Sequence, residues 1–427
     1  KESVYAPLTP HKYYSIAKSL GYLSPSNKNS NREFSSAPWD SPEEPKLGPL
    51  LYNGDYHHMQ PCNPEFSCNK GIGGDLNGKV WWTSGVFSIQ GRSEKQEDRF
   101  CVIPKFDEYC SQYCSSDESI GFFGVYDGHG GFEASQYLKE DLHKLVAGTI
   151  DDFKIDAKRS MFAAFSRADE KFLDLSEKYC LFSGSTALLV MVFGERILVG
   201  SVGDCEAVLC RGSEAILLAR KHTPERADET QRITRANGWL TEEKELFLQQ
   251  LKQMDLLDPC IRDNAAKQVK WTTITRMCGE LSVSRAIGDC EFKGFTKKRK
   301  QLGVQGISPE MPELFDWPEG HSGLFHDDLI IAEPEFNEFA LTNDVRFVVL
   351  ACDGLWDVMD HEEAVEHAML LLEKGFCAQA VSEKLCELAF RLGTSDNVTV
   401  VVVAFHHDSP LAYFPSRTSG DVGSIQK

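Results

Sequence analysis

The segment FGVYDGHGG, residues 123–131, joins an apolar run directly to an aspartate that is followed by glycines. An apolar run of this length is typical of a buried strand, and the glycines allow a sharp bend and a close approach of the backbone to a ligand. At such a bend the Asp127 carboxylate and the Gly128 carbonyl can bind a hard cation. His129 follows as a candidate proton donor. The segment therefore predicts a strand that ends at a ligand site.

Acidic residues also stand at the ends of other apolar runs. A single aspartate at a strand end is usually a turn former or a helix cap, so one such residue carries little weight. Several such places in one chain favour an acidic cleft to which different strand ends contribute. The acidic residues at these places are Glu97, Asp98, Asp127, Asp204, Asp353, Asp357 and Asp396.

Short apolar runs bounded by Gly, Asp and Asn predict the strands. They lie at residues 86–89, 121–126, 186–193, 197–202, 207–210, 347–351 and 398–405. Apolar residues that repeat every three or four positions predict amphipathic helices at 156–175, 362–372 and 381–388. The runs 197–202 and 207–210 are so close together that we expect an antiparallel hairpin. Strands in groups, rather than in alternation with helices, indicate an α+β domain in which packed sheets are covered by helices.

The first 80 residues differ from the rest, because Pro, Ser, Asn and Gly cluster there. We expect residues 1–80 to form an irregular N-terminal extension, residues 81–408 the main domain and residues 409–427 a C-terminal tail. Two polar segments interrupt the strand pattern, and we expect both to be surface insertions. They are residues 225–275, with a helix at 242–257, and residues 291–327, which carry the basic run 297–300.

Composition narrows the class of protein. The chain has 427 residues and a net charge of −19, without the basic excess of nucleic-acid-binding proteins. Its apolar runs are too short to span a membrane. The 14 cysteines follow no regular disulfide spacing, so we expect an intracellular, reducing compartment. We expect this compartment to be the cytoplasm or nucleus, or an organelle if a targeting segment has been removed. The sequence indicates no oligomeric state.

Seven segments resemble, in the same order, the motifs of the metal-dependent type 2C protein serine/threonine phosphatases. Any one of these motifs is a weak indication, whereas the ordered set, between residues 86 and 405, is specific. The segments are Glu97-Asp98, Asp127-Gly-His-Gly-Gly131, Gly184-Ser-Thr-Ala187, Val202-Gly-Asp204, Val283-Ser-Arg-Ala-Ile-Gly-Asp289, Asp353-Gly-Leu-Trp-Asp357 and Asp396-Asn397.

The resemblance implies a central antiparallel β-sandwich flanked by α-helices, with a centre for two Mg²⁺ or Mn²⁺ ions. By the same resemblance, Asp127 bridges both metals. Glu97 and the Gly128 carbonyl bind one metal, and Asp353 and Asp396 bind the other. Carboxylate and carbonyl ligands suit such hard cations.

A third metal site and the reaction are also implied by the resemblance. Asp204 and Asp357 resemble residues of a weaker third metal site. A water activated by two cations would attack the phosphorus of phosphoserine or phosphothreonine in a phosphorylated protein substrate. His129 would protonate the leaving oxygen.

The sequence departs from the family pattern near the first motif. The family usually has a phosphate-binding arginine four residues before the metal-binding glutamate, where this chain has Ser93. Arg92, moved by a one-residue bulge, or Lys95, as a point charge, would take over this role in catalysis and substrate binding. Glu206 stands where the family often has arginine, and we expect it to face solvent. We expect Asp289 to be structural and to tie a loop.

The leading hypothesis is an active protein phosphatase. The displaced arginine and the insertions also admit a catalytically inactive family member that acts as a binding or scaffold protein, which metal binding without turnover would favour. A third hypothesis is a metal-dependent phosphatase for small molecules. A comparison of phosphopeptides with sugar phosphates would separate the third hypothesis from the first.

Overall fold

The computed structural model describes residues 72–74, 80–110, 119–149, 156–246 and 271–407. All of them belong to one unit, Cys62–Lys427. Most of the expected N-terminal extension and the whole of the expected C-terminal tail lie outside the described residues. The described part of that extension holds a short strand, β1 (Ile72–Gly74), which pairs with the first long strand of the main domain.

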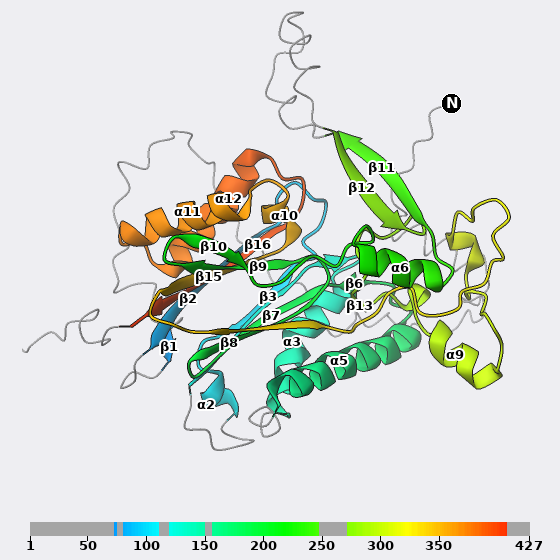
Figure 1. The fold of residues 1–427 in the computed structure, drawn as a ribbon, viewed down its shortest axis with the longest axis horizontal. Helices are drawn as coiled ribbons and strands as arrows, with labels where there is room; N and C mark the ends of the chain where they lie inside the picture. Colours follow the sequence, from blue (N-terminus) through cyan, green and yellow to red (C-terminus); the bar gives the residue numbers. More distant parts are fainter. Residues whose placement is uncertain (1–71, 75–79, 111–118, 150–155, 247–270, 408–427) are drawn as a thin grey trace, which may run out of the picture. The chain divides into compact units, whose positions relative to one another are not determined.

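Among the described residues, two large antiparallel sheets form the centre of this unit (Figure 1). The six-stranded sheet has the order β1, β2 (Trp81–Ile89), β16 (Val398–His406), β15 (Val345–Ala351), β9 (Glu206–Arg211) and β10 (Glu214–Leu217). The five-stranded sheet has the order β14 (Glu335–Ala340), β8 (Arg196–Val202), β7 (Ala187–Phe193), β4 (Ile120–Tyr126) and β3 (Arg99–Ile103). The predicted α+β class with an antiparallel sandwich is confirmed.

The two sheets pack face to face, and helices cover their outer faces. Val401 and Val403 of β16 pack in the layer between the sheets, together with Val190 of β7. Val400 and Val402 point the other way and pack against helices. Because both faces of the strand are buried, its sequence is apolar throughout and does not alternate with polar residues.

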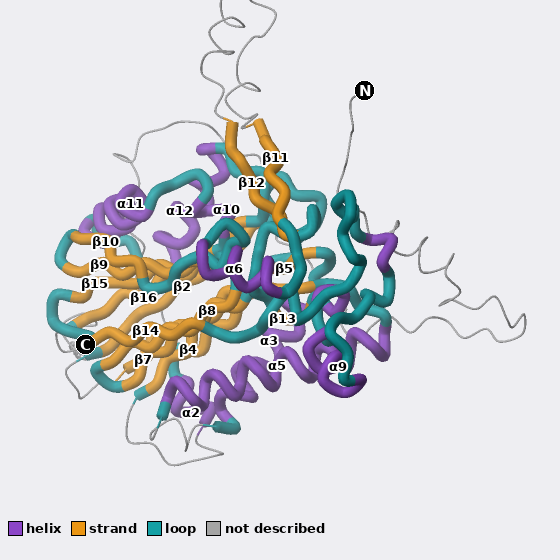
Figure 2. Tube along the Cα trace, turned by 45° about the vertical axis from the view of Figure 1, so that its right-hand side comes forward, coloured by secondary structure: helices purple, strands orange, loops and turns teal. Residues whose placement is uncertain are grey.

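Helices α11 (His361–Glu373) and α12 (Ala378–Leu392) cover the six-stranded sheet, with the short α10 (Asp353–Trp356) beside them (Figure 1). Helices α3 (Glu133–Ala147) and α5 (Ala157–Tyr179), with the short α2 (Phe106–Cys110), cover the five-stranded sheet (Figure 2). The three helices expected from apolar periodicity are confirmed. No helix in the described ranges combines the length and the apolar character needed to cross a membrane.

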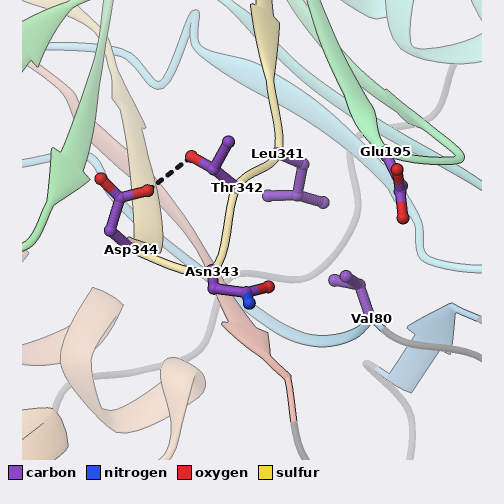
Figure 3. Close-up of a pocket in the computed structure, with 6 residues that line it drawn as sticks. All are labelled: Val80, Glu195, Leu341, Thr342, Asn343 and Asp344. Atoms are coloured by element: carbon purple, nitrogen blue, oxygen red, sulfur yellow. Dashed lines mark hydrogen bonds between the residues drawn. The ribbon is translucent and has the colours of Figure 1, made fainter.

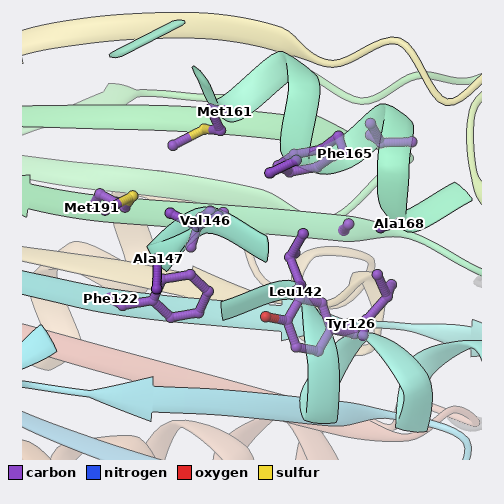
Figure 4. Packing of buried hydrophobic residues seen from close by; sticks show 14 of the residues in the cluster. Phe122, Tyr126, Leu142, Val146, Ala147, Met161, Phe165, Ala168 and Met191 are labelled. Atoms are coloured by element: carbon purple, nitrogen blue, oxygen red, sulfur yellow. The ribbon is translucent and has the colours of Figure 1, made fainter. Parts of the chain in front are cut away.

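The apolar stripe of α5 explains its position. Met161 and Phe165 lie on one face of the helix and pack in a buried cluster with Leu142 of α3 and Met191 of β7 (Figure 4). Full burial of one such side chain stabilises the fold by about 1.5–3 kcal/mol. The helix begins at Asp156, whose carboxylate accepts a hydrogen bond from a free N–H of the first turn.

Shorter elements continue from the sandwich. The strands β5 (Gly128–His129), β6 (Gly184–Ser185) and β13 (Ile287–Gly288) form a small sheet in the order β13, β6, β5. Strands β11 (Leu240–Leu246) and β12 (Trp271–Met277) pair with each other. The remaining described helices are α6 (Ala227–Arg235), η2 (Cys290–Phe292), α9 (Phe295–Leu302) and η3 (Pro312–Leu314).

Two expectations about local structure are wrong. Strands β8 and β9 do not form a hairpin, because β8 pairs with β7 and β14 whereas β9 pairs with β10 and β15. Residues 203–205 carry the chain from one sheet to the other, and Gly203, with φ of 100°, makes that turn. Residues 242–246, expected in a helix, belong to β11, since cross-strand pairing with β12 outweighs their local preference. Residues 247–257 lie outside the described residues.

Candidate active site

Strand register brings the acidic strand ends of the five-stranded sheet together. Arg99 of β3 pairs with Tyr126 of β4. Glu97 and Asp98 precede β3, and Asp127 follows β4, so these three acidic residues meet at the same end of the sandwich. Sequence motifs that lie almost thirty positions apart therefore form one site.

The six-stranded sheet contributes acidic residues to the same place. Asp353 follows β15, and Asp396 stands two residues before β16, which is paired with β15. Asp204 follows β8 in the connection between the sheets. The pKa of Asp127 is raised well above its ordinary value, first by burial and then by the nearby carboxylates of Asp98, Asp353, Asp396 and Asp204. The structure thus brings the predicted acidic residues into one electrostatically coupled group.

The most closely spaced donor atoms of this group come from Asp98, Asp127 and Cys352. Within the described residues, one donor atom of each lies within 4.8 Å of the others. Burial raises the pKa of Asp98 to about 6, although the hydroxyl of Thr399 donates a hydrogen bond of 2.7 Å to Oδ2 of Asp98. Burial also raises the pKa of the Cys352 thiol well above its ordinary value. The centre of the site is therefore a buried concentration of acidic groups.

This group of carboxylates fits divalent cations. The Oδ1 atom of Asp353 is buried and receives no hydrogen bond from any described residue. Burial raises the pKa of Asp353 well above its ordinary value, and Asp204 and Asp396 raise it further. A buried carboxylate is costly unless an opposite charge or a metal compensates it. Hard cations such as Mg²⁺ and Mn²⁺ take oxygen ligands of this kind.

The backbone of Glu97 is fixed by residues from other segments. Its N–H donates to Oδ1 of Asn397 at 2.8 Å, and its carbonyl accepts a hydrogen bond of 2.5 Å from the hydroxyl of Ser135 on α3. The Asn397 amide also donates to two carbonyls of the loop that precedes Glu97, at 2.9 and 2.8 Å. A Cβ at Gly128 would collide with the Glu97 carbonyl, so only glycine allows this approach.

His129 faces Asp289 across the small sheet. Its Nε2 lies 2.9 Å from both carboxylate oxygens of Asp289, and Asp289 is 3% exposed. Burial alone would lower the pKa of His129, but the Asp289 carboxylate outweighs it and holds the pKa above its ordinary value. The imidazole is thus held in a fixed direction and favoured in its protonated form.

Comparison with known proteins agrees with this geometry. Residues 82–398 match the family model described as protein phosphatase 2C. The chain belongs to the protein phosphatase 2C family. A probable protein phosphatase 2C 59 of Arabidopsis thaliana is 30% identical over 362 residues, which are 82% of this chain and 92% of the relative. A probable protein phosphatase 2C 59 of Oryza sativa subsp. japonica is 28% identical over 361 residues, with 84% and 86% covered.

A solved structure supports the fold. The serine-threonine phosphatase 2C from Toxoplasma gondii aligns with a TM-score of 0.51 at 20% identity, covering 76% of this chain and 95% of its own. At this identity the similarity concerns the architecture alone. It agrees with the paired antiparallel sheets and outer helices described above.

The two basic residues considered for phosphate binding have different surroundings. The Nη1 atom of Arg92 donates to the carbonyls of Phe390 and Thr394 at 3.2 and 2.8 Å, and the guanidinium lies 4.3 Å from the centre of the Phe390 ring. Arg92 therefore ties its loop to the end of α12. Lys95 is exposed, and its charge opposes the effect of burial, which raises the pKa of Glu97.

Glu206, which we expected to face solvent, is buried. Its side chain is 7% exposed, and burial raises its pKa. Its two carboxylate oxygens lie 3.7 Å from Nζ of Lys221 and 3.3 Å from Nε2 of His361. Trp356 covers this position and donates its indole N–H to the Glu206 carbonyl at 3.2 Å. These partners make burial of the charge tolerable.

Some residues that contribute to the site were given no role in it from the sequence. Asp98 and Asn397 stand inside two of the quoted motifs, next to Glu97 and Asp396, so their neighbourhood was a usable signal. Asp289 was assigned only to structure, although it also ended a motif. Lys221 gave no signal, because it belongs to no quoted motif and its partners come from other segments.

A shallow pocket of about 630 Å³ lies at the opposite end of the strands, where β8 begins and β14 ends (Figure 3). Thr342 and Asp344 form a hydrogen bond there. The side chains that line this pocket include no histidine, cysteine or cation. Its lining residues are Val80, Glu195, Leu341, Thr342, Asn343 and Asp344. This pocket therefore lacks the group of converging acidic residues found at the other end of the sandwich.

Proposed function

We propose that this chain hydrolyses phosphoserine and phosphothreonine in protein substrates with the help of two divalent cations, Mg²⁺ or Mn²⁺. The observation that carries the proposal is the convergence of Asp127, Asp353 and Asp396 from both sheets into one acidic group. Asp127 and Asp353 are half-buried and Asp396 is exposed, and the buried Oδ1 of Asp353 receives no hydrogen bond from any described residue. Carboxylates this close together repel one another unless positive charge compensates them, and divalent cations with oxygen ligands supply such charge.

The ligand assignment comes from the family resemblance, and the clustering of these residues supports it. Asp127, at the centre, would be shared by both cations. Glu97 and the Gly128 carbonyl would bind one of them, because the backbones of Glu97 and Gly128 approach each other closely. Asp353 and Asp396 would bind the other. When bound, the cations supply an activated water and positive charge against the phosphate oxygens.

The side chains around this centre would handle the proton and the substrate. His129, kept protonated and oriented by Asp289, would give its proton to the leaving serine or threonine oxygen. Lys95 would attract the phosphate as an exposed point charge next to Glu97. Arg92 would act on the reaction only through the loop that it anchors to α12.

The basic run 297–300 in α9 offers a surface for acidic sequence around the phosphosite. Lys298 and Arg299 are paired with Glu310 and Asp327 at 2.5 and 2.9 Å. Lys297 and Lys300 are exposed on the same helix. Charge reversal at these two positions would raise KM for acidic phosphopeptides and leave turnover of p-nitrophenyl phosphate unchanged.

A reducing compartment suits this function. The thiols of Cys205, Cys352 and Cys386 are buried in or beside the sandwich and form no disulfide. Cys352 lies within the acidic group itself. Its oxidation would place a bulkier, charged group against Asp98 and Asp127.

The direct test is hydrolysis of p-nitrophenyl phosphate and of a phosphothreonine peptide with Mn²⁺ or Mg²⁺, with and without EDTA. Wild type would be compared with Asp353→Asn and with Asp344→Asn, a surface aspartate at the other end of β15. We expect turnover that depends on the cation and that Asp353→Asn lowers at least about 100-fold. Loss of a group that only orients a metal ligand costs up to about 100-fold in activity, and loss of a ligand itself should cost at least as much. Asp344→Asn should leave turnover unchanged.

The second candidate is an inactive family member that binds partners. The observation in its favour is the anchored Arg92, which leaves the family's usual arginine position to Ser93. Folded wild-type protein that binds Mn²⁺ but hydrolyses neither substrate would support this candidate and overturn the first.

A further inference from the structure

Lys221 brings a positive charge to the edge of the acidic site. Its Nζ lies 3.0 Å from Oδ1 of Asp357 and 3.7 Å from Oε1 of Glu206. A lysine side chain is ordinarily charged at neutral pH, and two carboxylates at ion-pair distance favour that charge further. The ammonium therefore stays charged and neutralises part of this acidic edge.

The position of Lys221 is fixed by its backbone neighbours. The N–H of His222 donates to the carbonyl of Gly203 at 2.9 Å, and the N–H of Gly203 donates to Nδ1 of His222 at 3.1 Å. Arg226 donates to the Lys221 carbonyl at 3.3 Å. His222 is completely buried. Because Gly203 directly precedes Asp204, these contacts hold the two segments that carry Lys221 and Asp204 side by side.

Asp204 and Asp357 are the two residues for which a weaker, third metal site was expected. In the structure, Asp357 has an ammonium as its partner, and the Gly203–His222 contacts hold the buried Asp204 in the segment next to that ammonium. A divalent cation between Asp204 and Asp357 would be repelled by the ammonium over a few ångströms. The donor set therefore fits a third cation poorly while Lys221 keeps its place.

We propose that the Lys221 ammonium takes the place of a third divalent cation, so that the chain binds two cations rather than three. The inference rests on the proposed two-cation function. It adds that a lysine side chain of this chain supplies the positive charge that a third cation would otherwise supply. Removing the charge while keeping most of the side-chain volume should free Asp204 and Asp357 for a metal.

The experiment counts bound Mn²⁺ by equilibrium dialysis and elemental analysis over micromolar to millimolar metal. We expect two ions per chain for wild type and a third, weaker ion for Lys221→Met. In Lys221→Met the additional replacement Asp357→Asn should remove the third ion again. Lys384→Met, which removes a partly buried lysine paired with Glu387 at 2.8 Å on α12, is the matched control and should bind two.

Three ions in wild type, or only two in a folded Lys221→Met variant, would overturn the inference and leave the proposed function intact. Asp353→Asn separates the two proposals, because it should lower the count below two only if the two-cation site exists. If Lys221→Met does not fold, Asp357→Asn in the wild-type background decides. If Lys221 occupies the third site, Asp357→Asn should bind two ions, as wild type does. If a metal occupies that site, the count should fall from three in wild type to two in Asp357→Asn.

Discussion

The imidazole Nε2 of His129 lies 2.9 Å from both carboxylate oxygens of Asp289, which stands 160 positions later in the chain. The strands β5, β6 and β13 bring the two residues together. Asp289 has a φ of 52°, a conformation that costs a residue other than glycine about 1–2 kcal/mol. A buried carboxylate held in this conformation against a histidine positions that histidine and its proton.

Asp289→Asn should therefore impair proton donation. We expect kcat for a phosphothreonine peptide to fall by roughly 10- to 100-fold, within the range for weakened general acid catalysis. The loss for p-nitrophenyl phosphate should be smaller, because nitrophenolate leaves without needing a proton. Steady-state kinetics on both substrates checks this, with Asp327→Asn, a half-exposed aspartate paired with Arg299, as the control. Equal losses on both substrates would assign Asp289 to structure alone.

Gly184→Ala should disturb the contact between His129 and Asp289 by steric collision. A Cβ at this position would collide with Oδ2 of Asp289 and with Nε2 of His129. We expect the same preferential loss of phosphopeptide turnover as in Asp289→Asn, although every polar group remains. Gly148→Ala is the control, since Gly148 likewise has no positive φ and a Cβ there would meet its nearest neighbours only at 3.5 Å. A Gly184→Ala enzyme with normal phosphopeptide kinetics would show that the His129–Asp289 contact is dispensable.

The fold class followed from the sequence because buried strands and amphipathic helices leave strong local patterns. Strand pairing left no such pattern. The run 197–202 and the run 207–210 look like a hairpin, but the Gly203 turn carries the chain between two sheets. Residues 242–246 are mostly charged and suit a helix locally, yet they pair with β12. Both errors concern partners that only tertiary structure chooses.

In the candidate site, too, residues with a local sequence signal could be predicted, whereas residues placed by tertiary contacts could not. Acidic residues at strand ends could be found one by one, because each stands close to an apolar run, before or after it. Glu206 could not be placed, since its burial depends on Lys221, His361 and Trp356 from distant segments. Arg92 was proposed for phosphate on spacing alone, and its contacts with the end of α12 become visible only in three dimensions.

Lys95→Ala and Arg92→Ala should have different effects. Loss of Lys95 should raise KM for phosphopeptides about 10-fold, because a hydrogen bond to a charged group contributes about 1.5–3 kcal/mol. Arg92→Ala should mainly lower stability, by about 1 kcal/mol, since it removes two hydrogen bonds and the contact with Phe390. Kinetics and urea unfolding of both variants check this. A large KM effect confined to Arg92→Ala would restore the bulge hypothesis.

Glu229→Gln should destabilise the fold strongly. Glu229 is 1% exposed and accepts hydrogen bonds from Arg285 at 2.6 Å and from Arg232 at 2.9 Å. Breaking a buried ion pair costs about 3–5 kcal/mol, because partners are left without compensation. Urea unfolding should show a loss of about 3 kcal/mol for Glu229→Gln. Glu338→Gln, which breaks a surface pair with Arg196, should stay within about 1 kcal/mol of wild type. Similar losses in both variants would contradict this ranking.

Glu291→Gln should stabilise the protein at alkaline pH. Burial raises the pKa of Glu291 from 4.5 to about 8, and its buried Oε1 receives no hydrogen bond from any described residue. The folded state therefore holds this proton more tightly than the unfolded state. Its contribution to stability is complete below about pH 4.5 and is lost as the pH rises through about 8. One pKa unit corresponds to about 1.4 kcal/mol, so the variant should gain on the order of 1 kcal/mol or more over wild type between pH 5 and 9. Urea unfolding at several pH values measures this difference, with the exposed Glu94→Gln as the control for loss of one carboxylate. A difference from wild type that does not change with pH would mean that Glu291 is solvated and ionised in the folded protein.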